Sequence, residues 1–367
     1  MIDKFAFIIH PIDPKRDIGR KFPALGKLPA WLIEYLSLFS PPVHVSDISG
    51  IQSKENGRFI EGTFVACTMT PKRMMNLPPE VVYKKIIQAV RYAEKMGAQL
   101  LGLGAFTSVV GDSGVTIANN LNIPVTTGDS YTIATAVQAI EKAASMMELP
   151  IETTTVAIVG ATGAIGSICA EILAPQIDNL ILIGRRMNKL EEVAQNARAV
   201  GCANVLVTSD IKQLINAHLV ITVTSAIDTI IKPKHLRRGA IVCDVARPRD
   251  VSQQVAKQRP DVLVIEGGMV EIPGPVDFGF NFGFPPKMAY ACMAETMALT
   301  LEKRFESYTL GKDITLSQVK TIDTIATKHG FKLGGFRSFE RAVTDEEIAN
   351  IKMHIQSEIT PMQQEIF

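Results

Sequence analysis

Residues 156–167 read VAIVGATGAIGS, a continuous apolar run that passes directly into a glycine-rich turn. The run predicts a buried strand, and the AIGSICAEIL that follows predicts a helix. Glycines in such a turn let the backbone approach a pyrophosphate, and the helix N-terminus offers amide donors and a positive dipole end. We therefore predict a dinucleotide site formed by Gly160, Ala161, Thr162, Gly163, Ala164, Ile165 and Gly166. The alternative is a glycine-rich turn that binds no ligand.

The second apolar run of this region ends in two basic residues: residues 179–186 read NLILIGRR, with Arg185 and Arg186 at the end. A site that selects NAD usually has an acidic residue here, about 20 residues past the glycines, which binds the ribose 2′-hydroxyl. Two guanidinium groups can instead bind a 2′-phosphate bidentately. The pair favours NADP(H) as the cofactor, unless both side chains are simply solvated at the end of a strand.

Four more apolar runs follow in order: NVLVTS, HLVITVTSA, AIVCDVA and DVLVIEGG. Continuous Val, Ile and Leu runs are typical of a parallel sheet that helices cover on both faces. Ligands of such sheets bind at the carboxyl ends of the strands, so Thr224, Ser225 and Ala226 at the end of the second run are candidate cofactor contacts. These features predict a doubly wound, Rossmann-type NADP(H)-binding domain over residues 151–275.

The rest of the chain predicts two further segments, since 367 residues exceed one ordinary core. Strand and helix patterns alternate over residues 1–150, which indicates an N-terminal α/β substrate domain. Residues 276–367 are predicted to be mainly helical, and Thr344 with Glu347 has the spacing of a capping box. The predicted fold class is α/β: an N-terminal α/β lobe and a Rossmann-type domain, with C-terminal helices.

Composition excludes several classes of protein. Hydrophobic residues make up 47% and charged residues 20%, as in packed globular proteins, and a net charge of +1 argues against nucleic-acid binding. Five scattered cysteines argue against a disulfide framework or a metal site. The first apolar run is too short for a signal peptide, and the longest uncharged stretches are broken by glycines. We expect a cytoplasmic protein that is not integral to a membrane; its oligomeric state cannot be predicted from these features.

One cysteine has an unusual setting: residues 287–301 read KMAYACMAETMALTL, with Cys292 in the middle of a helical pattern. Free cysteines are commonly buried as packing residues. Pro285 and Pro286 suit a helix start, which would leave Cys292 in the second turn, where the helix dipole has faded. Glu295, three residues on, lies on the same helical face and would disfavour a thiolate. From these residues alone, Cys292 could be either a core residue or a nucleophile.

Several segments together resemble the cyanobacterial long-chain fatty acyl-[acyl carrier protein] reductases over most of residues 1–335. They are GRFIEGTFVACTMTP, LGLGAFTSVVG, TTGDSYTIATAV, VAIVGATGAIGS, EGGMVE and YACMAETMALTLE. The resemblance implies NADPH-dependent reduction of an acyl thioester to an aldehyde, with acyl carrier protein or coenzyme A as the carrier. It also implies that Cys292 holds the acyl group. The chain departs from this family at Tyr131, where a histidine is expected, and in the glycine-free DVARPRD.

The remaining candidates concern the substrate. Thr107, Ser108 and Asp129 could donate hydrogen bonds to a developing oxyanion, or they could serve ordinary loop and cap bonding. Phe280 and Phe282 in FGFNFGF could form an apolar loop that binds the acyl chain. One alternative is an alcohol or ketone dehydrogenase of the shikimate dehydrogenase type, which would need a lysine–aspartate pair that the sequence does not clearly offer. Another is a non-catalytic sensor of NADPH and acyl chains.

Overall fold

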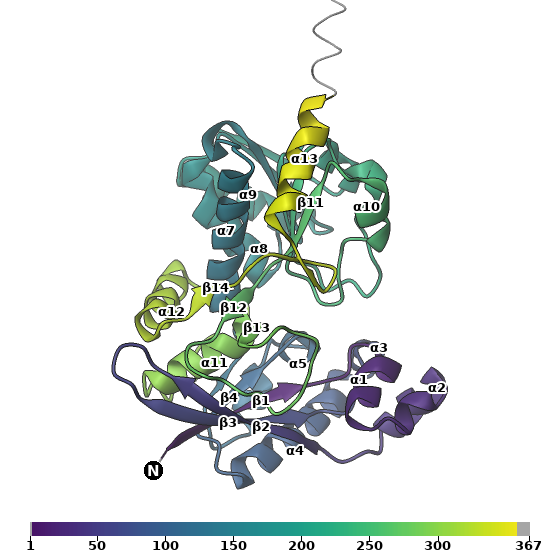
Figure 1. Cartoon of the computed structure of the whole chain (residues 1–367), viewed down its shortest axis with the longest axis vertical. Helices are drawn as coiled ribbons and strands as arrows, with labels where there is room; N and C mark the ends of the chain where they lie inside the picture. Colours follow the sequence, from purple (N-terminus) through teal and green to yellow (C-terminus); the bar gives the residue numbers. More distant parts are fainter. Residues whose placement is uncertain (1, 358–367) are drawn as a thin grey trace, which may run out of the picture. The chain divides into compact units, whose positions relative to one another are not determined.

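The computed structural model describes residues 2–357, and the chain divides into two compact units (Figure 1). The first comprises the residues up to Tyr131 together with Val270–Gly334, and the second comprises Thr132–Met269 and the segment that starts at Gly335. The three domains expected at 1–150, 151–275 and 276–367 remain a prediction. The boundaries of the compact units fall at other positions, because residues 270–334 pack with the first unit and the segment that starts at Gly335 packs with the second.

The first unit contains a five-stranded sheet of order β2-β3-β1-β4-β5. Its strands are β1 (Asp3–Ile9), β2 (Val43–Gln52), β3 (Phe59–Ala66), β4 (Leu100–Leu103) and β5 (Val125–Thr126). All neighbours pair in parallel except β2, which runs antiparallel to β3 at one edge. The parallel strands therefore end at the same edge, where loops can gather side chains.

The side chains of β1 point alternately to the two faces of this sheet. Ala6 and Ile8 pack with the buried face of α4 (Pro79–Lys95), while Phe7 lies on the opposite face. That face is covered by α11 (Ala291–Leu301). Gly102 permits the close approach of the helix, since a Cβ there would lie 2.2 Å from Oγ1 of Thr296.

Shorter elements complete the first unit. After β1 come α1 (Pro14–Lys21), the 3₁₀ turn η1 (Leu25–Lys27) and α2 (Ala30–Ser37), and α1 and α2 lie side by side at one end of the unit (Figure 1). The others are α3 (Pro71–Asn76), α5 (Phe106–Val109), α6 (Val115–Ala118), α12 (Leu316–His329), β12 (Met269–Glu271), β13 (Met288–Tyr290) and β14 (Lys332–Leu333). The last three form a small sheet of order β13-β12-β14.

The second unit contains a six-stranded sheet of order β11-β10-β9-β6-β7-β8, and all its neighbouring strands are parallel. The strands are β6 (Thr155–Val159), β7 (Asn179–Ile183), β8 (Asn204–Thr208), β9 (Leu219–Thr222), β10 (Ile241–Asp244) and β11 (Leu263–Glu266). The first strand lies in the middle and the order reverses beside it, which is the doubly wound Rossmann arrangement. The predicted α/β fold class is confirmed.

The other α-helices are α7 (Asp129–Met146), α8 (Ala164–Leu173), α9 (Met187–Ala199), α10 (Gln253–Gln258) and α13 (Asp345–Ser357). Helix α8 follows the pattern predicted for AIGSICAEIL, whereas α10 was not predicted. The capping box predicted before α13 is confirmed: the amide of Glu347 donates to Oγ1 of Thr344, and the amide of Thr344 donates to the Glu347 carboxylate, both at 3.1 Å. The short remaining elements are η2 (Ile151–Thr153), η3 (Ala174–Gln176), η4 (Ile211–Asn216), η5 (Pro233–His235), β15 (Arg337–Ser338) and β16 (Arg341–Ala342).

Within residues 2–357, none of the helices combines the length and apolar character that crossing a membrane requires.

Candidate functional site

The glycine-rich turn of the second unit has the geometry of a pyrophosphate cradle. Gly160 follows β6 at a φ of +86°, and a Cβ there would lie 2.5 Å from the carbonyl oxygen of Val223. At Gly166, in the first turn of α8, a Cβ would lie 2.5 Å from the carbonyl oxygen of Gly160. Gly163 caps the start of α8, whose first amides lack partners within the helix. Side chains at Gly160 and Gly166 would clash with the neighbouring loop and with the backbone of the turn itself, so glycine is what allows the strand, the turn and α8 to pack this closely.

Arg185 and Arg186 follow β7 and are both exposed, next to this turn in the sheet. Nη2 of Arg186 donates to the carbonyl oxygen of Thr162 at 3.0 Å and lies 3.3 Å from its hydroxyl. The guanidinium of Arg186 is thus bonded to the glycine-rich turn, and the neighbouring Arg185 is exposed. This arrangement fits a 2′-phosphate bound beside the turn.

The loop after β9, which contains Thr224, Ser225 and Ala226, is held by a residue that the sequence reasoning missed. Asp250 is fully buried and accepts from the hydroxyls of Thr222 and Thr224, both at 2.6 Å, and from the Thr224 amide at 3.0 Å. Its only sequence signal was an acidic residue in DVARPRD, a few residues past an apolar strand. Asp250 fixes the backbone of the loop at the carboxyl edge of the sheet.

Cys292 differs from the other four cysteines, all of which are buried, because it is partly exposed. The expectation that it lies in the second turn of a helix is wrong. Residues 288–290 pair as β13, so α11 starts only at Ala291 and Cys292 is its second residue. A thiolate in the first turn is stabilised by the helix dipole and by nearby backbone amides.

The backbone around Cys292 is closely packed at the carboxyl edge of the first sheet. A Cβ at Gly128, which follows β5, would lie 2.2 Å from Cα of Cys292. A Cβ at Gly104, which follows β4, would lie 3.7 Å from the Cys292 sulfur. The loops after two adjacent parallel strands therefore meet the first turn of α11.

Two acidic residues act on this thiol. Although the residue keeps some exposed surface, protein atoms surround most of the thiol. This burial, followed by the charge of Asp129, raises the pKa of Cys292 to about 12, and Glu295 also raises it. Burial and the charge of Glu295 raise the pKa of Asp129 to about 7. The thiol is therefore protonated at neutral pH, and the carboxyl group of Asp129, whose charge acts on it, has a pKa of about 7.

Glu295 itself has a structural role that the sequence did not reveal. It is fully buried, and its carboxylate accepts from the Thr126 hydroxyl, from the Thr309 hydroxyl at 2.9 Å and from the Tyr131 amide at 2.8 Å. Burial raises its pKa. These bonds join α11 to residues 126–131 and thereby hold Gly128 against Cys292.

Thr107 and Ser108 are buried, and their hydroxyls bond within their own turn. The Thr107 hydroxyl donates to the carbonyl of Gly104 at 2.8 Å, and the Ser108 hydroxyl donates to that of Ala105 at 2.7 Å. Both hydroxyls are thus used within the turn, and their role in binding a substrate remains a prediction.

His10, the residue just past β1, is bonded to the same turn. Its ring nitrogen accepts from the Phe106 amide at 3.1 Å, and burial lowers the pKa of His10 to about 4, which keeps the imidazole neutral.

Aromatic rings of the FGFNFGF segment form a chain that ends at Tyr290, two residues before Cys292. Phe282 contacts Phe64, Phe278 and Phe284 at centroid distances of 5.0–5.5 Å. Phe284 in turn lies 4.6 Å from Tyr290, the residue that precedes α11. Phe280 is half-buried and takes part in no ring contact within the described chain. The structure therefore brings Phe282, rather than Phe280, into the aromatic cluster that leads to Tyr290.

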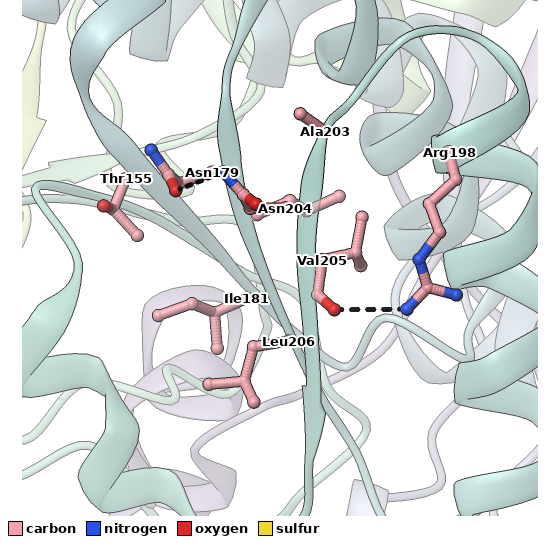
Figure 2. A pocket seen from close by; sticks show the side chains of 9 residues that line it. Thr155, Asn179, Ile181, Arg198, Ala203, Asn204, Val205 and Leu206 are labelled. Carbon is pink, nitrogen blue, oxygen red and sulfur yellow. Dashed lines mark hydrogen bonds between the residues drawn. The ribbon is translucent and has the colours of Figure 1, made fainter.

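A cavity of about 440 Å³ lies elsewhere, at the amino ends of β6, β7 and β8 (Figure 2). It is lined by Thr155, Asn179, Leu180, Ile181, Arg198, Ala203, Asn204, Val205 and Leu206, and Nη2 of Arg198 donates to the Val205 carbonyl at 3.2 Å. Because the glycine-rich turn follows the carboxyl ends of the strands, this cavity is separate from the candidate cofactor site. Over residues 2–357, no three His, Cys, Asp or Glu side chains are grouped to hold a metal ion.

Comparison with known proteins supports the assignment of the second unit. Residues 141–266 match the Shikimate / quinate 5-dehydrogenase family. The match covers about a third of the chain and includes the glycine-rich turn, both arginines and the Thr224 loop. The second unit is an NAD(P)(H)-binding domain, and the predicted nicotinamide dinucleotide cofactor is confirmed.

Two relatives match more of the chain. Aminotransferase PigE of a Serratia species is 29% identical over 376 residues, which cover 97% of this chain and 42% of the relative. The chain thus spans less than half the length of that protein. The long-chain acyl-[acyl-carrier-protein] reductase of Synechococcus elongatus is 26% identical over 80% of this chain and 88% of its own length. Among solved structures, L-tryptophan dehydrogenase from Nostoc punctiforme aligns over 97% of this chain and 89% of its own, with 12% identity and a TM-score of 0.41.

Proposed function

We propose that this chain is an NADPH-dependent reductase that converts a fatty acyl thioester to an aldehyde, with the acyl group held on Cys292. The observation that carries the proposal is the position of Cys292, partly exposed in the first turn of α11 beside Asp129. The similarity to a protein named as an acyl-carrier-protein reductase supports the same chemistry.

The reaction proceeds in two stages. The Cys292 sulfur attacks the thioester carbonyl carbon, the bond from that carbon to the carrier sulfur breaks, and the carrier leaves as a thiol. NADPH, when bound, supplies the hydride that reduces the acyl group on Cys292. The resulting hemithioacetal loses its bond to sulfur, the sulfur regains a proton, and the aldehyde is released. The cysteine thus divides one difficult reduction into two easier steps.

Asp129 is proposed as the general base for the first stage. A thiol with a pKa of about 12 is almost entirely protonated at neutral pH, so its proton must pass to a neighbour as the sulfur attacks. Asp129, with a pKa of about 7, is suited to accept that proton and to return it when the carrier or the product leaves. The oxyanion contact expected of Asp129 from the sequence remains the alternative prediction for this residue.

The pH dependence of acylation tests this role. Only the ionised carboxylate accepts a proton, so the rate should fall as pH drops through about 7 and level off above it. Asp129→Asn should lower the rate by about 10²–10⁴-fold and remove that inflection. Single-turnover acylation between pH 5 and 9 measures both effects. Asp47→Asn, at an exposed carboxylate of the same unit, should keep the native profile; an unchanged inflection in Asp129→Asn would exclude the proposed base.

Arg185 and Arg186 are proposed to select NADP(H) over NAD(H). Replacing both by alanine should weaken NADPH binding by about 10–100-fold, because a charged, bidentate contact to the 2′-phosphate is lost. NADH binding should change by less than about twofold, since NADH lacks that phosphate. Titration of nucleotide fluorescence measures both constants. Arg198→Ala removes an exposed arginine of the same unit and should alter neither; equal losses for the two cofactors would contradict selection by the pair.

The cluster around Phe282 is proposed to bind the acyl chain, because its rings continue from the sheet to Tyr290. A continuous series of apolar rings that ends two residues before Cys292 supports this role, because a long acyl group needs apolar contacts. The same chemistry serves a thioester of acyl carrier protein or of coenzyme A.

The decisive experiment is the intact mass of the full chain after mixing with a long-chain acyl-CoA or acyl-carrier-protein thioester, without NADPH. A gain of one acyl group, located by peptide mapping to Cys292 and released as aldehyde on adding NADPH, supports the proposal. The Cys67→Ser chain should give the same adduct, because Cys67 is buried and burial raises its pKa to about 11. If NADPH binds but neither carrier leaves an adduct, a cysteine-free dehydrogenase becomes the better reading of the fold.

A further inference from the structure

A dense group of exposed apolar side chains lies on α1, η1 and α2 in the first unit. It comprises Phe22, Leu25, Trp31, Tyr35, Leu36 and Phe39, which we term the aromatic patch. Trp31 is 68% exposed and Phe39 is 70% exposed, although large apolar side chains of this kind are normally buried. A concentration of this size within 18 residues marks an interaction surface rather than scattered surface residues.

The patch is held facing outward by the packing of α2. Ile33 and Ser37 on its inner face are buried, and the Thr68 hydroxyl donates to the Ser37 carbonyl at 3.1 Å. Nζ of Lys85 donates to the carbonyl of Ser40, also at 3.1 Å, which fixes the end of the segment. The opposite face of α2 therefore remains exposed, and its rings are ordered against each other, with Tyr35 and Phe39 in edge contact at 5.4 Å.

The charges around the patch are mainly positive. Residues 13–39 contain five basic side chains, Lys15, Arg16, Arg20, Lys21 and Lys27, against the acidic Asp13, Asp17 and Glu34. Asp13 and Asp17 are used to form the start of α1: Asp13 accepts from the Arg16 amide, and Asp17 accepts from the amides of Ile12 and Asp13. Arg16 and Arg20 also pair with Asp17, and Nζ of Lys21 donates to the Val45 carbonyl at 2.5 Å. All five basic residues nevertheless keep exposed surface beside tryptophan, tyrosine and phenylalanine.

We propose that the aromatic patch binds the surface of a lipid bilayer that contains anionic headgroups. Tryptophan and tyrosine favour the boundary between headgroups and acyl chains, where one side of the ring is apolar and the other is wet. Neighbouring basic side chains add electrostatic attraction to anionic lipid. An acidic protein would pair with the lysines and arginines but would leave rings that are about 70% exposed without an apolar environment. The inference does not depend on the proposed reaction.

Trp31 makes the test direct, because it is the single tryptophan of the chain. The full chain is titrated with vesicles of phosphatidylcholine containing 30% phosphatidylglycerol, chosen here as the probe, while Trp31 emission and co-sedimentation are followed. Binding with a blue shift of the emission is expected, and high salt should weaken it because the headgroup contribution is screened. No co-sedimentation, or no change in Trp31 emission, would overturn the proposal.

Variants assign the binding to the patch. Tyr35→Ser with Phe39→Ser should weaken vesicle binding by about tenfold or more, because the apolar surface of two rings is no longer transferred from water into the bilayer. Trp31 remains as the reporter in this variant. The matched control, Phe59→Ser with Tyr92→Ser, removes two exposed rings elsewhere in the same unit and should bind as the native chain does. An equal loss in both variants, or a Trp31 blue shift produced by acyl carrier protein but not by vesicles, would contradict the membrane assignment.

Discussion

Cys292→Ala should reduce aldehyde formation by at least about 10³-fold while NADPH binding stays within twofold of the native value. The loss follows because the variant has no atom that can hold the acyl group, so the thioester can no longer be reduced in two steps. NADPH binding is retained because the glycine-rich turn, Arg186 and the Asp250-held loop belong to the second unit. Steady-state turnover and nucleotide titration of the same sample measure the two quantities together.

Cys67→Ala is the matched control for that loss. Cys67 lies just past β3 of the same sheet, so Cys67→Ala also removes one sulfur atom from the first unit. It is buried, and a small cavity should cost stability without lowering turnover more than about threefold. Residual activity above a tenth of native in Cys292→Ala would exclude the acyl-enzyme route, and an equal loss in Cys67→Ala would point to the structure of the sheet edge.

The cofactor domain could be predicted from sequence because its signals are local. A run such as VAIVGATGAIGS contains the strand, the turn and the helix start in twelve residues, and the later strands are continuous apolar runs. Strand β2 was not predicted. Its register with β3 shifts between His44 and Ser46 and again between Ile48 and Ile51, so its sequence lacks the strict alternation that reveals an edge strand.

The surroundings of Cys292 could be predicted only in part, because they depend on contacts between distant segments. The cysteine was a candidate from its sequence, but the start of α11 depends on the pairing of β13, which no local pattern shows. The bonds from Glu295 to Thr126 and Tyr131 link positions more than 160 residues apart. A glutamate three residues after a cysteine suggests repulsion of a thiolate, whereas in the fold it also positions the neighbouring loop.

Gly128→Ala should slow acylation of Cys292 by about 10²-fold, because a displacement of about 1 Å at a reacting group is enough for such a loss. A Cβ at this position would lie 2.2 Å from Cα of Cys292 and 2.8 Å from its carbonyl oxygen, so the loop or the start of α11 must move. The φ of +77° adds strain for any residue with a Cβ. The bonds to Glu295 oppose movement of the loop, so part of the displacement must fall on the cysteine.

Gly97→Ala separates the contact from the strain. Gly97 has a φ of +90° in the same unit, and a Cβ there would meet no atom within 4 Å. It should therefore lose about 1–2 kcal/mol of stability from backbone strain and keep native acylation. Acylation rates from intact mass, set beside the free energy of unfolding in denaturant, distinguish the two variants. If Gly128→Ala acylates as fast as Gly97→Ala, then the contact between the loop and the first turn of α11 does not position the sulfur for attack.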